Sequence, residues 1–152
     1  MKFFLSALTL FSTMTTLWMT APAQAREINK NYIGPSLTLT SGLTGFGAVG
    51  KYGVAENISI RPFAHFFSAN QLTLAVYGAG ATYDYTFPKS DITIYGGLGL
   101  AGATVAAGGQ SYSGIDSGVR LMVGADYRVS DSLIVNLNSN LGYYSVGAGF
   151  NF

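Results

Sequence analysis

Seven charged residues share one phase of the alternating pattern of this sequence, the phase that also carries most of the glycines. They are Lys51, Arg61, Asp84, Asp116, Arg120, Asp126 and Arg128. Cations and anions on one face can pair with each other, and charges removed from water must pair, because an unpaired buried charge costs several kcal/mol. We therefore predict an ionic network with a structural role. A gated pore, in which a rearranged network admits ions, stays open as an alternative.

His65 is the only histidine of the chain and lies in the segment A-H-F-F-S-A-N. This segment resembles the His-x-Ser-Asn motif of the lipid A deacylase family of eight-stranded barrels. Ser68 follows His65 by three residues instead of two, which places the two side chains on opposite faces of a strand. A nucleophile needs its base within hydrogen-bond reach. We therefore predict no catalytic residues, no enzymatic activity and a structural His65 near the outer rim.

Two glycine-rich segments, at residues 45–50 and 97–102, match the dinucleotide-binding pattern G-x-G-x-x-G. That pattern binds a pyrophosphate only where it follows a strand and opens a helix, and the residues after Gly102 are small and polar without a helical pattern. With one histidine and no cysteine, the chain also lacks the usual ligands of zinc. We expect neither a cofactor nor a metal.

The first 25 residues have the pattern of a secretory signal peptide. Lys2 precedes an uncharged, mostly apolar stretch, and Ala23-Gln24-Ala25 forms a small-x-small cleavage site. We therefore predict a signal peptide at residues 1–25 and one exported domain at residues 26–152. The formal net charge of the chain is +1, so we expect no nucleic-acid partner.

The composition favours a membrane barrel over a soluble domain. Charged residues make up only 10% of the chain, against about 25% in typical soluble proteins. The chain has no cysteine, so disulfides cannot stabilise an exported domain. Residues 26–152 contain no continuous apolar run long enough for a transmembrane helix. The structure that can still span a membrane is a closed barrel. In it, hydrogen bonds between neighbouring strands satisfy every backbone N–H and C=O group.

An alternation of period two recurs along the chain and predicts strands. The predicted strands cover residues 32–40, 46–54, 58–67, 72–87, 92–105, 115–129, 133–138 and 141–152. We also predict a bulge near Ala75 and a long loop at residues 106–114. Eight is an even number, as in single-chain bacterial barrels. The predicted fold class is therefore all-β, an eight-stranded antiparallel up-and-down transmembrane β-barrel.

Alternation alone does not decide which face of the barrel lies inside. A soluble eight-stranded barrel that holds a ligand also alternates, with its apolar face around the ligand. The interior of an eight-stranded barrel is only just wide enough for side chains, and here Tyr, Phe, Ile and Leu fill the apolar face. We therefore predict that glycines and charges lie inside. Apolar side chains face outer-membrane lipid, with an aromatic girdle at the turn-side ends of the strands.

The last strand alternates to its end, and its apolar face consists of Tyr144, Val146, Ala148, Phe150 and Phe152. With the segments K-Y-G-V-A-E-N-I-S-I and G-A-D-Y-R-V-S-D-S-L, it resembles the small outer-membrane barrel families of the OmpA transmembrane domain, OmpX and opacity-protein type. The resemblance implies that the barrel-assembly machinery reads these residues as an insertion signal. It also implies periplasmic termini and a monomer.

The resemblance specifies the class of barrel better than its role. Family members with adhesive roles carry long outer loops, whereas the outer loops expected here are short and offer little recognition surface. We therefore predict a structural role in envelope integrity, with the interior plugged by the ionic network. The alternatives are a narrow pore and a surface-binding role, in which Gln110 and Tyr112 of the predicted loop make the contacts.

Overall fold

The computed structural model describes residues 31–40, 42–69, 72–107, 110–114, 118–140 and 142–152. The predicted signal peptide and its cleavage site lie outside these ranges, so the boundary at residue 25 stays a prediction. Within them, no helix is long and apolar enough to cross a membrane.

The described residues form one antiparallel sheet that closes into a barrel. Its strands are β1 (Tyr32–Thr40), β2 (Leu43–Ala55), β3 (Ile58–Ala69), β4 (Leu72–Thr86), β5 (Ile92–Ala107), β6 (Gln110–Gly114), β7 (Val119–Arg128), β8 (Leu133–Asn140) and β9 (Tyr143–Asn151). Pairing of β1 with β9 and of β4 with β5 closes the sheet. Both β6 and β7 pair with β5, at successive heights, so they share one position in the wall. The predicted eight-stranded barrel is confirmed.

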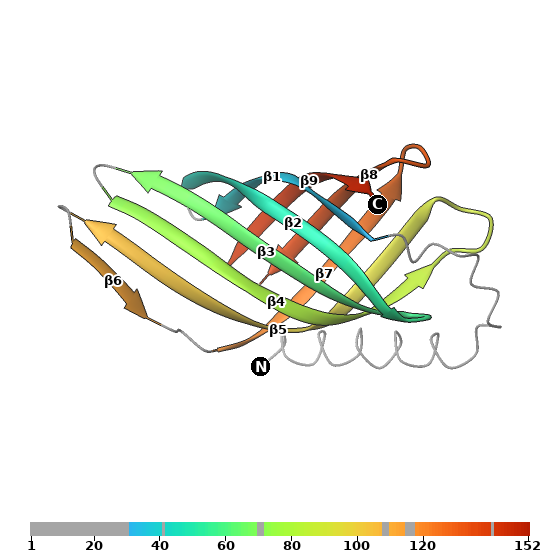
Figure 1. Ribbon diagram of the computed structural model, residues 1–152, viewed down its shortest axis with the longest axis horizontal. Helices are drawn as coiled ribbons and strands as arrows, with labels where there is room; N and C mark the ends of the chain where they lie inside the picture. Colours follow the sequence, from blue (N-terminus) through green and yellow to red (C-terminus); the bar gives the residue numbers. More distant parts are fainter. Residues whose placement is uncertain (1–30, 41, 70–71, 108–109, 115–117, 141) are drawn as a thin grey trace, which may run out of the picture.

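The two ends of the barrel differ (Figure 1). At one end, which we term the turn end, short turns join β2 to β3, β4 to β5 and β7 to β8, and the C-terminus lies nearby. At the other end, the hairpin end, β1 leads to β2, β3 to β4, β5 to β6 and β8 to β9. The β3–β4 and β5–β6 hairpins extend beyond their neighbours there, so one side of the wall is taller than the other.

Several segment boundaries differ from those predicted, three of them in segments rich in small and polar residues. The predicted loop at residues 106–114 instead contains the end of β5 and all of β6. Strand β8 continues to Asn140, which is 1% exposed and pairs with Tyr143. Strand β2 begins at Leu43, directly after a turn in which Gly42 has a φ of +83°. Small and polar residues normally mark turns, but in this barrel they also form strands whose polar side chains face inward.

The predicted bulge near Ala75 is wrong. The register of β4 with both neighbours is continuous through this residue, and the register shift lies between Gly53 and Ala55 in β2. The first residues of β4 fit both phases because Leu74 and Val76 face an apolar part of the lumen.

The barrel is apolar outside and polar inside. Its exposed side chains include Ile33, Leu37, Leu39, Phe46, Leu98, Leu100, Val119, Leu137, Tyr144 and Val146, and, near the turn end, Tyr52, Tyr127, Phe150 and Phe152. Its buried polar and charged side chains include Ser36, Thr38, Lys51, Ser59, Arg61, His65, Thr82, Asp84, Thr93, Asp126, Asn136, Asn138, Asn140 and Ser145. This inversion is expected of a barrel that lies in lipid.

Substituting arginine on the outer face tests the inversion. Leu98 is 58% exposed in the middle of β5, and Val129 is 52% exposed beside a turn. We expect Leu98→Arg to lower the free energy of unfolding by about 2–4 kcal/mol and Val129→Arg by at most about 1 kcal/mol, because the cost of a charge depends on its depth in the bilayer. Urea unfolding in lipid vesicles measures both. Equal losses at the two positions would contradict a lipid-facing outer surface.

Candidate functional site

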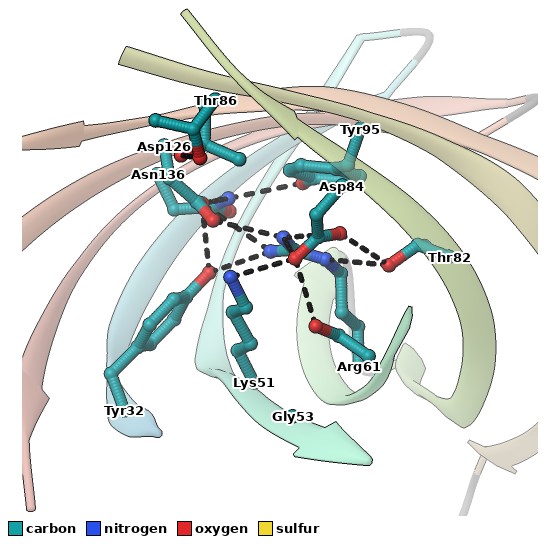
Figure 2. Close-up of polar contacts among 12 residues, drawn as sticks. Tyr32, Lys51, Gly53, Arg61, Thr82, Asp84, Thr86, Tyr95, Asp126 and Asn136 are labelled. Atoms are coloured by element: carbon teal, nitrogen blue, oxygen red, sulfur yellow. Dashed lines mark hydrogen bonds and ion pairs between the residues drawn. The ribbon is translucent and has the colours of Figure 1, made fainter. Parts of the chain in front are cut away.

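Inward side chains in the turn-end half of the lumen converge on Arg61 of β3 (Figure 2). Arg61 is 3% exposed. Its Nη2 lies 3.1 Å from each carboxylate oxygen of Asp84 and 2.9 Å from Oδ2 of Asp126. One buried cation therefore bridges carboxylates from β4 and β7, two strands that are not neighbours in the barrel wall.

The remaining donors of Arg61 are also bonded within the lumen. Nη1 donates to the hydroxyl of Tyr32 at 3.0 Å and to Oδ1 of Asp126 at 3.3 Å, and Nε donates to Oγ1 of Thr82 at 3.0 Å. The guanidinium carbon lies 3.5 Å from the centre of the Tyr95 ring, a cation–π arrangement. Polar partners thus surround the edge of the guanidinium, and an aromatic ring covers one of its faces.

Asp84 is the more heavily bonded of the two carboxylates. Lys51 Nζ lies 2.6 Å from its Oδ2, and Ser59 donates to the same oxygen at 2.8 Å. Thr82 accepts from Arg61 and donates to Oδ1 of Asp84 at 3.0 Å. Charge-assisted bonds of this kind are about twice as strong as neutral ones, and they replace the water that the carboxylate lost on burial.

Asp126 is held by side chains from β1 and β8 as well as by Arg61. Its Oδ1 accepts from Asn136 at 2.7 Å and from the Tyr32 hydroxyl at 3.0 Å. Asn136 also donates to the Tyr95 hydroxyl at 3.0 Å. The Arg61 network therefore consists of Tyr32, Lys51, Ser59, Arg61, Thr82, Asp84, Tyr95, Asp126 and Asn136. Two cations meet two anions in it, so its formal charge is balanced.

Glycines make room for the two aromatic members of the network. A Cβ added at Gly124 would overlap the hydroxyl end of Tyr95, and one added at Gly149 would overlap the ring of Tyr32. Glycine in a strand interior often marks such a close approach. Charged and glycine residues share a phase because long side chains from one part of the wall occupy the space that glycines leave elsewhere on it.

Of the seven residues predicted for the ionic network, the structure brings four together: Lys51, Arg61, Asp84 and Asp126. Arg128 lies at the turn end, where its Nε is 3.7 Å from Oδ1 of Asp91. Arg120 lies near the hairpin end, beside Tyr143. Asp116 is outside the described residues. The six described residues share a phase but not a height along the barrel axis.

Sequence reasoning missed the uncharged members of the network. Ser59 and Thr82 each stand two residues before a charged member, Arg61 and Asp84, so strand alternation could have placed them on the inner face. Asn136 is also on an inward phase. Its bonds to Asp126 and Tyr95 depend on the pairing of β7 with its neighbours, which no local pattern reveals.

His65 is fully buried in the lumen, toward the hairpin end from Arg61. Its Nδ1 lies 2.9 Å from Oγ1 of Thr38, and its ring stacks on Phe63 and meets the ring of Tyr143 edge-on. Ser68 is exposed, so the two polar residues of the deacylase-like segment face opposite sides of the wall. Among the described residues, no group of three acidic or histidine side chains could hold a metal ion.

The remaining predicted residues lie on the outside or beyond what is described. Tyr144, Val146, Phe150 and Phe152 are between 51% and 77% exposed on the outer face of the last strand and its end, and Ala148 is half-buried on the same phase. Gln110 and Tyr112 belong to β6, but their side chains are outside the described part of the chain.

Removing the central cation should destabilise the barrel. We expect Arg61→Ala to lower the free energy of unfolding by about 3–5 kcal/mol, because it leaves two buried carboxylates with too few cations. Arg128→Ala is the matched control and should cost less than about 1 kcal/mol, since its partner Asp91 is 61% exposed. Urea unfolding in vesicles measures both. A loss at Arg61 no larger than that at Arg128 would show that the network contributes little.

Solved structures of three bacterial barrels share the fold. The N-terminal β-barrel domain of Pseudomonas aeruginosa OprF has a TM-score of 0.63 and 15% identity, over 82% of this chain and 98% of that one. Neisserial surface protein A has a TM-score of 0.55 and 19% identity, over 81% and 95%. Ail, the attachment invasion locus protein of Yersinia pestis, has a TM-score of 0.51 and 16% identity, over 81% and 97%. At these identities the likeness concerns the fold alone.

The sequence itself identifies the family. A comparison with curated proteins finds no match, but residues 9–152 match the outer membrane protein β-barrel domain. The match covers nearly the whole chain and agrees with the closed barrel and with its apolar outer face. The predicted class of small outer-membrane barrel is confirmed, and the chain belongs to the outer membrane protein β-barrel domain family.

Proposed function

We propose that the protein has a structural role in the outer membrane, as a monomeric barrel whose lumen is sealed by the Arg61 network. The observation that carries the proposal is the complete bonding of the Arg61 guanidinium. Each of its nitrogens donates to a partner inside the lumen, and the two carboxylates it bridges are themselves bonded from other strands. A balanced, fully bonded network has little tendency to release a charge to a passing ion.

The position of the network supports a seal. Its members come from β1, β2, β3, β4, β5, β7 and β8, so it reaches across the lumen from most of the wall. An apolar cluster that includes Val49, Phe63 and Met122 packs next to it. The void bounded by both layers has a volume of only about 10 Å³, roughly the least that accommodates one water molecule. An ion would have to displace both layers to pass.

The orientation of the barrel in the outer membrane follows from the usual form of such barrels. In these barrels, short turns face the periplasm and longer connections face the outside of the cell. The turn end would then be periplasmic, together with both termini of the mature protein. The outward aromatic residues of β9 would be available to the assembly machinery, and the remaining outer face would contact lipid. Removal of residues 1–25 during export completes this proposal.

A surface-binding role is the second candidate, and the β5–β6 hairpin favours it because it extends beyond the rest of the wall at the hairpin end (Figure 1). Deleting residues 106–113 tests it. If binding is the function, adhesion of cells that display the protein should fall to the level of cells without it, while the barrel stays folded. Unchanged adhesion would leave the structural role.

Conductance in planar bilayers tests the seal. We expect the refolded wild type to be silent, and Asp126→Ala to show discrete openings because it removes one of the anions that hold Arg61 in place. Arg128→Ala, outside the network, should be silent and serves as the control.

Two results would contradict the proposal. Discrete channels in the wild type, with an ion selectivity that changes in Asp126→Ala, would make the protein a narrow pore. Silence of an Asp126→Ala variant that is shown to be folded and inserted would mean that another part of the lumen forms the seal.

A further inference from the structure

A cavity of about 160 Å³ lies in the lumen near the hairpin end. Residues from the hairpin-end parts of β1, β3, β4, β5, β7 and β9 contribute to its wall. Three of its lining residues, Val76, Ala101 and Tyr143, also pack in or against the apolar cluster next to the Arg61 network. The cluster is therefore the floor of the cavity, and a solute that enters from the hairpin end meets packed side chains before it reaches the network.

Apolar side chains form most of the wall of this cavity. Three neighbouring strands, β3, β4 and β5, supply Phe67, Leu74, Val76, Ala101 and Ala103. Leu74 and Val76 are only half-buried even though they point into the lumen, because they face the cavity. A ligand that covers this apolar surface removes it from water, and its binding is favoured for that reason.

The polar side chains that line the cavity already have partners. The Thr40 hydroxyl donates to the Gly142 carbonyl at 2.6 Å, and the Tyr143 hydroxyl accepts from the side-chain amide of Asn140. Arg120 also interacts with another group of the protein. A ligand therefore gains mainly apolar contacts here, and none of these three side chains depends on it for a partner.

We propose that this cavity is a binding site for an uncharged, apolar molecule of the size of one benzene ring. An engineered protein cavity of about 150 Å³ binds benzene, so the volume suits a single ring. The ring would contact Phe67, Val76 and Ala101, while the polar side chains at the wall keep the partners they have.

The state of the polar side chains decides between an apolar ligand and a charged one of the same size. A carboxylate that enters the cavity loses its water, and this loss is costly unless a new partner replaces the water. Since each polar side chain at the wall already has a partner, a carboxylate would have to displace one. The site should therefore prefer a neutral ring to the same ring with a carboxylate.

Methyl NMR of the refolded protein in lipid nanodiscs tests the site, with toluene as the probe and benzoate as its charged analogue. We expect toluene to shift the methyl signals of Leu74, Val76 and Ala101 in a saturable way. Toluene dissolved in lipid should shift those of Leu98 and Val123, on the outer face, without saturation, which separates the cavity from the bilayer. Benzoate should bind at least about tenfold more weakly than toluene, because of the water it loses.

Variants that fill the cavity provide a second test. Val76→Phe places a ring in the cavity and Ala103→Leu adds volume at another point of its wall, so each should abolish the saturable shifts of Leu74 and Ala101. Val123→Phe, on the outer face, is the matched control and should leave them unchanged. Heat-modifiable gel mobility verifies that each variant is folded.

Three results would overturn the proposal. They are benzoate binding as tight as toluene binding, saturable shifts retained in folded cavity-filling variants, and the absence of saturable shifts in the wild type up to the solubility limit of toluene. None of these outcomes depends on whether the lumen conducts ions, so the site can fail while the proposed seal stands.

Discussion

The pairing of Arg61 with Asp84 and Asp126 inside a closed wall is the interaction on which the rest of the structure depends. An eight-stranded barrel leaves an interior just wide enough for side chains, so charges placed there lose most of their water. Each must find a full set of partners among the other inward side chains, and the network supplies them from most strands. Glycines such as Gly124 provide the necessary space. The combination of glycines and polar side chains on the inner face of the wall follows from this need for bonding partners and for space.

Much of the fold could be predicted from the sequence because a membrane barrel keeps a strict period of two. The glycine phase, the charged phase and the inner face coincide, so inward positions could be assigned without a structure. The height of a residue along the barrel axis could not be predicted in this way. Arg120 and Arg128 lie on the same phase of one strand as Asp126, yet only Asp126 joins the network. Height depends on the register with neighbouring strands, which the local pattern does not encode.

Some of the errors in the predicted strands have one physical cause. The sequence predicts a strand that ends at Asn138 and leaves Asn140 outside it, because Asn and Ser favour turns in proteins whose interiors are apolar. Here the interior is polar, and the side chains of both residues are buried in it. Leu74 and Val76 are the reverse case, since they are apolar residues on the inner phase and made the phase of β4 ambiguous. In each case the residue type matches the polarity of the lumen at the height of that residue. This polarity changes along the barrel axis, from an ionic region to a partly apolar one.

That change along the axis divides the lumen into two parts that can be altered separately. The Arg61 network occupies the turn-end half, the cluster around Phe63 and Met122 lies between, and the cavity with Arg120 occupies the hairpin end. Effects of substitutions on groups that share no partner and lie well apart usually add. The Arg61 network joins side chains from most of the strands at one end, so the residues at the other end need not hold the barrel closed. A half-apolar cavity can persist there because hydrogen bonds between neighbouring strands close the wall along its whole circumference, whether or not side chains fill the lumen.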